Sequence, residues 1–290
     1  MPIRLLVTGS SGQFGQEFCK LQSTRYEIIG MSRKDADISN PKQVKAVINK
    51  IRPQIVVHTA AITDVDACED NPDLAMKVNC AGAENVARAA KEMGVPIVHF
   101  STDYVFDGTK LSAYIESDIT CAISHYGKSK LAGENAIKDG NSNWTIIRTS
   151  LVYSEHRRNF VKSIITQAVS GKELRVVDDQ FSSPTWTKDI VDQTMKIIES
   201  NQTGLFHVAS KGETSRYEFA RLILKILKID AAVEPVTSEQ RPRLAKRPGR
   251  STLKSERLGA FGIDLMRPYN EAIEQFLKLH GAEILEEVKD

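Results

Sequence analysis

Cysteine is scarce in this sequence, and long apolar runs are missing. The four cysteines, Cys19, Cys68, Cys80 and Cys121, are scattered over 290 residues and form no C-x-x-C pair. This usage is typical of free thiols in a reducing compartment, so we expect a cytoplasmic protein without a disulfide framework. No apolar run approaches the roughly 20 residues that cross a bilayer, and the first residues do not have the pattern of a signal peptide. We therefore predict no membrane partner.

The sequence also has no excess of charge of one sign. Its 39 Lys and Arg residues nearly balance its 37 Asp and Glu residues, so no nucleic-acid partner is expected. The six histidines show no metal-ligand spacing, and no metal site is predicted. A G-x-S-x-G elbow and a Cys/His nucleophile pattern are both missing, which argues against the hydrolases that use them.

What the sequence does contain is a regular alternation of short apolar runs and longer amphipathic segments. Nearly continuous apolar runs predict buried strands at residues 3–8, 26–30, 55–58, 97–101 and 145–149. Helices are predicted between them at 13–22, 41–51, 72–93 and 125–138. Such alternation indicates parallel strands joined by right-handed crossovers. The fold class is therefore α/β, a doubly wound parallel Rossmann sheet with a small C-terminal substrate-binding lobe.

The second half is less regular. Helices are predicted at 159–170, 188–199, 215–227 and 270–280, and strands at 175–177 and 205–208. The charged segment from about 230 to 255, with four prolines, is expected to be loop-rich. We expect residues 1–150 to form the dinucleotide-binding core, with later elements from about 158–178 and 187–209 added to it. The lobe is expected to comprise about 210–290 together with the loops 151–157 and 179–186.

The first strand runs into T-G-S-S-G-Q-F-G at residues 8–15. Gly9 permits the tight turn, Gly12 lets the backbone approach a pyrophosphate, and Gly15 lets the next helix pack closely on the sheet. The expected cofactor contacts from this loop are Gly9, Ser11, Gly12, Gln13, Phe14 and Gly15.

The second predicted strand ends without the acidic residue that binds the ribose 2′-hydroxyl of NAD. Ser32 and Arg33 occupy its place and suit a 2′-phosphate, so NADPH is the expected cofactor and NADH the alternative. Asp37 and Ile38 follow shortly and are expected beside the adenine.

A Y-x-x-x-K pattern, Tyr126 and Lys130, opens the helix before the fifth strand. Positions i and i+4 share one helix face, and a nearby ammonium is expected to lower the phenol pKa. Thr102 ends the fourth strand and should lie over the same crevice. The three side chains form a hydroxyl–phenol–ammonium set that can protonate a carbonyl oxygen while hydride reaches its carbon.

The sequence resembles the dTDP-4-dehydrorhamnose reductase family, a branch of the extended short-chain dehydrogenases. The matching stretches are residues 8–15, 58–66, 78–82, 100–108 (F-S-T-D-Y-V-F-D-G), 126–134, 148–150, 159–162, 179–180, 183–185, 247–248 and 251. The resemblance implies NAD(P)H-dependent reduction of a 4-keto group on a nucleotide-activated deoxysugar. The implied substrate is dTDP-4-dehydro-L-rhamnose and the implied product dTDP-L-rhamnose.

The resemblance also assigns residues. It makes Thr102, Tyr126 and Lys130 catalytic, with Tyr126 and Lys130 also touching the cofactor. It places Ala60, Ala61 and Asn79 near the cofactor, and Asp103, Tyr104, Asn159, Gln180 and Arg247 on the substrate side. Arg247 belongs to a cluster of cations at 241–250 that we expect to include a contact to the substrate diphosphate. Some relatives bind magnesium at a dimer interface, and a homodimer is left open.

Three departures from the family pattern fall on the substrate side. Leu151 replaces a usual tryptophan, the lead-in to Tyr126 lacks its usual proline, and loop 154–158 lacks its usual glycine. These departures therefore bear on which sugar is bound, whereas the glycine-rich loop and the Y-x-x-x-K pair, which decide the reaction class, match the family. Two alternatives stay open: a non-catalytic NADP-binding subunit, like the regulatory subunit of methionine adenosyltransferase, and another sugar-nucleotide reductase or epimerase.

Overall fold

The apolar runs form a six-stranded parallel sheet in the computed structural model, which describes residues 1–288. The strands are β1 (Ile3–Thr8), β2 (Tyr26–Met31), β3 (Ile55–His58), β4 (Ile97–Thr102), β5 (Trp144–Thr149) and β10 (Gly204–His207). Their order is β10-β5-β4-β3-β1-β2. The chain leaves β1 for β2 and returns to β3 on the other side of β1, which creates the reversal point where such sheets bind ligands. The predicted doubly wound sheet is confirmed.

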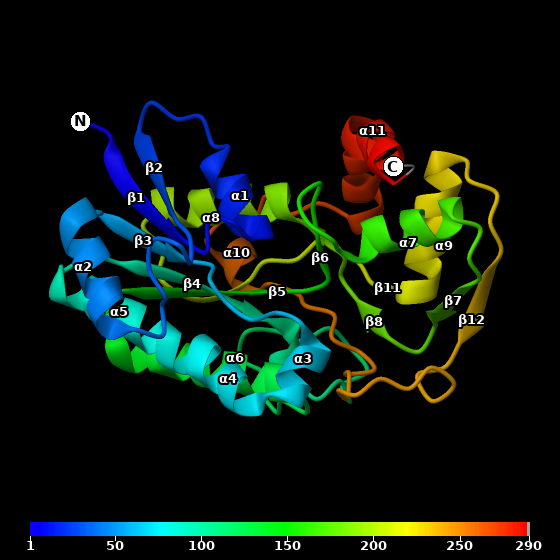
Figure 1. Cartoon of the computed structure of the whole chain (residues 1–290), viewed down its shortest axis with the longest axis horizontal. Helices are drawn as coiled ribbons and strands as arrows, with labels where there is room; N and C mark the ends of the chain where they lie inside the picture. The colour runs from blue at the N-terminus through cyan, green and yellow to red at the C-terminus, as the bar shows by residue number, and fades with distance from the viewer. Residues whose placement is uncertain (289–290) are drawn as a thin grey trace.

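Helices cover both faces of this sheet (Figure 1). One face packs against α2 (Pro41–Ile51), α5 (Gly82–Glu92) and α6 (His125–Gly140), through residues that include Val44, Val86 and Ile137. The other face packs against α1 (Gln13–Cys19), α8 (Thr187–Glu199) and α10 (Arg257–Ala260). Because both faces are covered, the central strands can be apolar throughout.

The helix predicted at 72–93 is interrupted. It forms α4 (Pro72–Met76), a π-helical turn (Lys77–Ala81) and then α5. The wider turn contains Asn79, whose buried side chain bonds both backbone groups of Ile62, which is a physical reason for the interruption. A short preceding helix, α3 (Val65–Asp70), was not predicted; it begins where the Asp64 side chain caps the amide of Ala67.

A second apolar core lies in the lobe on the right of Figure 1. It is built mainly by α7 (Phe160–Val169), α9 (Arg216–Leu227) and α11 (Tyr269–Glu287). Short strand pairs border it: β7 (Leu174–Val177) with β12 (Val233–Val236), β8 (Phe181–Ser182) with β11 (Thr214–Ser215), and β6 (Val152–Tyr153) with β9 (Thr185–Trp186). Among residues 1–288, no helix is both long enough and apolar enough to cross a membrane.

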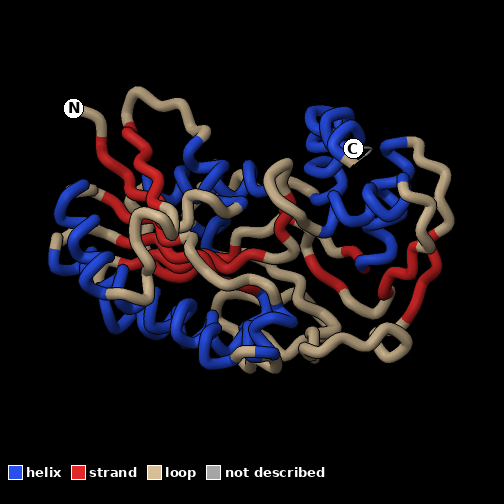
Figure 2. Tube along the Cα trace, viewed as in Figure 1, coloured by secondary structure: helices blue, strands red, loops and turns tan. Residues whose placement is uncertain are grey.

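One expectation about the second half is wrong. Residues 158–178 do not join the sheet, because α7 and β7 pack against α9 in the lobe core. The segment 230–255 is loop-rich, and its one named strand, β12, pairs in parallel with β7. After β12 the chain does run as a long irregular segment from the lobe back towards the core (Figure 2). Unlike residues 158–178, two elements of the segment 187–209 do belong to the sheet and its cover: β10 pairs with β5, and α8 packs on the sheet.

Candidate functional site

The loop between β1 and α1 is shaped by its glycines. Gly9 has a φ of +71°, and a Cβ there would lie 2.7 Å from the Cα of Ala60. A Cβ on Gly15 would lie 2.2 Å from the carbonyl oxygen of Gly9. The amide of Gly12 donates to that same oxygen at 2.9 Å. The turn has no room for side chains at these positions, and its bare backbone leaves space for a phosphate to approach.

A cavity of about 290 Å³ lies beside this loop, where β1, β2 and β3 end. The residues expected near the cofactor that line it are Gly9, Ser11, Gly12, Ser32, Arg33, Asp37, Ile38, Ala60 and Ala61. Apolar side chains of Ile62, Leu74 and Val78 complete one part of its wall. The cavity therefore combines a glycine backbone, a cation and an apolar surface, which is what a dinucleotide needs.

Six other residues expected to touch the cofactor do not line this cavity: Tyr126 and Lys130, described below, and Gln13, Phe14, Gly15 and Asn79. Gln13 accepts a hydrogen bond from Ser154 at 2.8 Å, and the ring of Phe14 stacks on Phe100 with centroids 4.6 Å apart. Gly15 packs on the turn, and Asn79 donates to Ser129 at 2.9 Å as well as bonding Ile62. These contacts hold the loop and the cavity wall in place.

The two residues expected at the 2′-phosphate differ in how far their side chains are already bonded within the protein. The Arg33 side chain is 88% exposed, and its nearest ionic partner is Asp37 at 3.8 Å. Hydrogen bonds from Ser39 hold the pKa of Asp37 below its usual range. The Ser32 hydroxyl instead donates to Asp35 at 2.7 Å. Arg33 is therefore the group better placed to receive an added phosphate.

The structure brings the expected catalytic residues together. Thr102 ends β4 and is buried, Tyr126 is the second residue of α6 and half-buried, and Lys130 lies one turn later and is buried. Helix α6 begins where the Ser124 hydroxyl accepts from the amide of Gly127, which fixes Tyr126 in the first turn of the helix.

The expected electrostatic effect of Lys130 on Tyr126 is not found. Burial raises the pKa of Tyr126, and the smaller effect of a hydrogen bond with Thr102 lowers it. The Lys130 ammonium donates to the carbonyl oxygen of Phe100 at 2.6 Å. Burial lowers the pKa of Lys130 to about 8, although Glu134 favours the charged form. The phenol is therefore protonated near neutral pH, as a proton donor must be.

Asp103 is buried rather than open to a substrate. Its carboxylate accepts hydrogen bonds from Ser150 at 2.7 Å, Ser251 at 2.5 Å and Thr102 at 3.0 Å. Burial raises its pKa. Through these hydrogen bonds Asp103 joins the end of β4 to the chain segment that returns from the lobe. Its neighbour Tyr104 packs edge-on against the ring of Tyr126, with centroids 5.8 Å apart.

The remaining substrate-side residues are bonded to groups other than the catalytic set. Asn159 caps α7 and donates to the carbonyl oxygen of Ser154 at 2.7 Å. Gln180 donates to Ser238 at 2.8 Å. Arg247 forms a two-pronged ion pair with Asp66 of α3, at 3.2 and 2.9 Å. This ion pair, with a smaller effect of the backbone amide of Ala245, lowers the pKa of Asp66.

One charged residue that lines the cavity was not expected. Arg157 lines the cavity, and its Nε donates to the carbonyl oxygen of Ser11 at 2.6 Å. The signal in the sequence was the unusual loop 154–158, which we placed on the substrate side. In the same region Glu17, Glu155 and His156 lie close enough together to hold a metal ion, although Lys20 already pairs with Glu155 at 2.6 Å.

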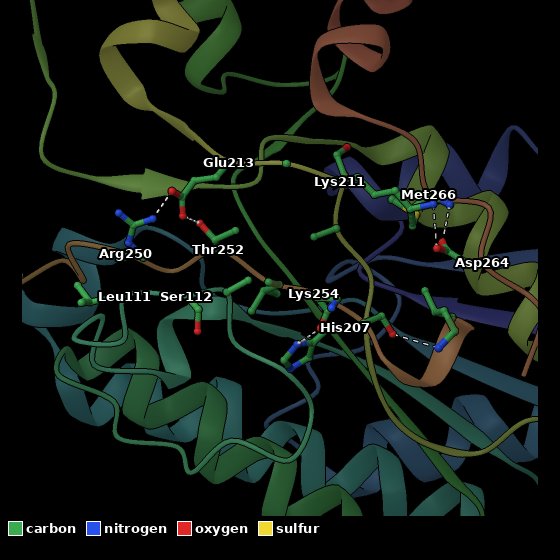
Figure 3. Close-up of a pocket in the computed structure, with 17 residues that line it drawn as sticks. Leu111, Ser112, His207, Lys211, Glu213, Arg250, Thr252, Lys254, Asp264 and Met266 are labelled. Atoms are coloured by element: carbon green, nitrogen blue, oxygen red, sulfur yellow. Dashed lines mark hydrogen bonds and ion pairs between the residues drawn. The ribbon is translucent and has the colours of Figure 1, made fainter. Parts of the chain in front are cut away.

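A larger cavity of about 550 Å³ lies elsewhere, beyond the edge strand β10 (Figure 3). Glu213, Arg250 and Thr252 form a hydrogen-bonded group on its wall. His207 also lines it; its Nδ1 faces two carbonyl oxygens and so carries the proton, and burial lowers its pKa to about 4. None of the expected site residues lines this cavity.

Comparisons with known proteins cover nearly the whole chain. A family model described as RmlD substrate binding domain matches residues 3–281. The spore coat polysaccharide biosynthesis protein SpsK of Bacillus subtilis is 38% identical over 95% of this chain and 97% of its own. A dTDP-4-dehydrorhamnose reductase of Burkholderia thailandensis is 34% identical over 91% of this chain and 94% of its own.

The comparison with solved structures finds proteins of the same name. A dTDP-4-dehydrorhamnose reductase from Clostridium acetobutylicum superimposes with a TM-score of 0.94, at 39% identity over 96% of this chain and all of its own. The enzyme of the same name from Bacillus anthracis, solved in complex with NADP, has a TM-score of 0.94, at 37% identity over 96% of this chain and all of its own.

Proposed function

The chain belongs to the RmlD substrate binding domain family, and from this we infer that it reduces the 4-keto group of dTDP-4-dehydro-L-rhamnose with NADPH, giving dTDP-L-rhamnose. The observation that carries the inference is the full-length similarity to proteins named dTDP-4-dehydrorhamnose reductase, one of them bound to NADP. We place the reaction in the cytoplasm, which the four free cysteines support.

The cofactor cavity fits NADPH on the chemistry of its own residues. The glycine backbone of residues 9–15 would hold the pyrophosphate, and Arg33 would hold the 2′-phosphate. Ala60 and Ala61, at the carboxyl end of β3, would lie along the cofactor. Bound NADPH supplies the hydride, so the protein has to supply the proton.

We assign that proton to Tyr126. Its raised pKa keeps the phenol protonated at neutral pH, and Thr102 is the hydroxyl that acts on it. As the keto oxygen takes the proton, Thr102 would stabilise the phenolate that remains, and Lys130 would hold the cofactor. Tyr104, packed on Tyr126, would line the substrate side. Asn159, Gln180 and Arg247 stay proposals for the rest of the substrate.

The direct test is to incubate the purified protein with NADPH and a set of nucleotide 4-keto sugars, following loss of the reduced-nicotinamide absorbance. We expect the highest kcat/KM with dTDP-4-dehydro-L-rhamnose. Tight binding of NADPH without reduction of any sugar would instead favour the regulatory-subunit alternative.

A second sugar belongs in that set. A dTDP-4-keto-6-deoxy-D-glucose reductase of Streptomyces niveus is 34% identical over 98% of this chain and 99% of its own. Leu151, where the family usually has tryptophan, also lies at the edge of the lobe core, with a φ of +37°. A higher kcat/KM with the D-glucose derivative would reassign the sugar without changing the chemistry.

A further inference from the structure

Three residues of the loop between β6 and α7 are bonded to the glycine-rich loop, to α1 or to the residue that follows α1. The contacts are Ser154 to Gln13 at 2.8 Å, Glu155 to Lys20 at 2.6 Å and Arg157 to the carbonyl oxygen of Ser11 at 2.6 Å. The loop thus lies across the element that forms one wall of the cofactor cavity. These contacts are long-range, since they join residues more than 130 positions apart.

The backbone of Arg157 is held in an uncommon conformation. Its φ is +50°, in the left-handed region that residues other than glycine seldom adopt. The side-chain amide of Asn159 donates to the carbonyl oxygens of Arg157, at 3.2 Å, and Ser154, at 2.7 Å. Such a conformation persists where neighbouring groups fix it, and here Asn159 fixes it.

The guanidinium of Arg157 has donors to spare. Its Nε is bonded to Ser11, and among residues 1–288 no carboxylate lies within ion-pair distance of it. The same side chain lines the cavity together with Gly9, Ser11 and Gly12. A guanidinium anchored through Nε leaves its two terminal nitrogens for an anion, and phosphate oxygens match their spacing.

We propose that Arg157 binds the pyrophosphate of the cofactor beside the glycine backbone, with Asn159 as the residue that positions it. The proposal rests on the proposed function, since it takes NADPH as the ligand. Arg157 is anchored on the glycine-rich loop, whereas Arg33 extends from the end of β2. The two cations therefore bind different phosphates: Arg157 the pyrophosphate, common to NADPH and NADH, and Arg33 the 2′-phosphate of NADPH alone.

The test measures the dissociation constants of NADPH and NADH by fluorescence titration, without any sugar. Arg157→Ala should weaken both cofactors to a similar degree, by about ten- to hundredfold, the range for a charge-assisted hydrogen bond. The matched control is Arg158→Ala, because Arg158 is the exposed neighbour whose Nε points to Ser163 at 3.4 Å. It should bind both cofactors as the unaltered protein does.

Unchanged binding by Arg157→Ala would overturn the proposal, and so would a loss confined to NADPH, which would move Arg157 to the 2′-phosphate. The circular dichroism spectrum and the Tm identify any variant that fails to fold, and Arg157→Lys then serves in its place, with a smaller loss for both cofactors. A protein that binds NADPH but reduces no sugar would refute the proposed function and leave this result standing.

The positioning role of Asn159 has its own test. Asn159→Ser keeps an oxygen to cap α7 but is too short to hold the two carbonyl groups. Introduced alone, Asn159→Ser should weaken NADPH binding. Added to Arg157→Ala, it should weaken binding little further, because both changes remove the same contact. Fully additive losses would refute the positioning role.

Discussion

Arg33 is the residue expected to set cofactor choice. Its ion pair with Asp37 is exposed and 3.8 Å long, so it contributes little and leaves the guanidinium available. A charge-assisted contact to the 2′-phosphate is worth roughly 1.5–3 kcal/mol, or about ten- to hundredfold in affinity. We expect Arg33→Asp to raise the KM for NADPH far more than that for NADH in steady-state assays. If the unaltered protein uses both cofactors equally well, Arg33 does not have this role.

At the level of single residues, the sequence predicted the residues whose position depends on local spacing. The three glycines, Tyr126 and Lys130 lie within short motifs, so their neighbourhood follows from the turn and the helix that contain them. Arg157 could not be placed in this way, because it reaches Ser11 across 146 positions of the chain. The pKa of Tyr126 was predicted in the wrong direction, since burial is a property of the fold and not of the motif.

Helix α6, which carries Tyr126 and Lys130, is tied to the sheet by a buried ion pair. Glu134 accepts from Arg148 of β5 through both oxygens, at 2.8 Å each, and also accepts from Ser101 of β4 at 2.6 Å. Glu134 is fully buried, and Arg148 is 3% exposed. A buried pair of this kind fixes the position of two elements relative to each other more than it adds to stability.

Removing one partner of this pair should therefore cost far more than removing both. Arg148→Met leaves the Glu134 carboxylate buried without its cation, and we expect a loss of about 3–5 kcal/mol in the free energy of unfolding. The double variant Glu134→Met/Arg148→Met should recover much of that loss. Urea unfolding at neutral pH measures both. A single variant that loses less than about 1 kcal/mol would contradict this role of the pair.

At the level of elements, long periodic segments were predictable and short ones were not. The strands and most helices of the first half have full apolar runs and clear caps, such as Asn40 before Pro41. Strands of two residues, such as β8 and β11, are too short to show a period. The π-helical turn at Lys77–Ala81 is fixed by what the Asn79 side chain bonds elsewhere in the fold, which helical periodicity does not reveal.

On the scale of the whole molecule, the division into core and lobe depends on pairing partners. The alternation of strands and helices predicted the parallel sheet because that pattern is local. It did not show that β7 pairs with β12, almost 60 residues later, and so it assigned residues 158–178 to the core. The lobe loop that bonds to Ser11 through Arg157 also lines the cavity beside the glycine-rich loop, so the two parts together form that cavity.

The central claim is that this molecule reduces a nucleotide 4-keto sugar by protonation from Tyr126. Tyr126→Phe keeps the ring that packs on Tyr104 and removes only the hydroxyl, so folding and NADPH binding should persist. General acid catalysis contributes about 10²–10⁴-fold, and the rate of hydride transfer should fall by that range.

The most direct measurement is a single turnover. Enzyme loaded with NADPH is mixed rapidly with dTDP-4-dehydro-L-rhamnose, and oxidation of the nicotinamide is followed for the unaltered protein and for Tyr126→Phe. The account predicts one rapid oxidation by the unaltered protein and a rate at least about 100-fold lower in the variant, at equal NADPH occupancy. An undiminished rate in Tyr126→Phe would contradict it.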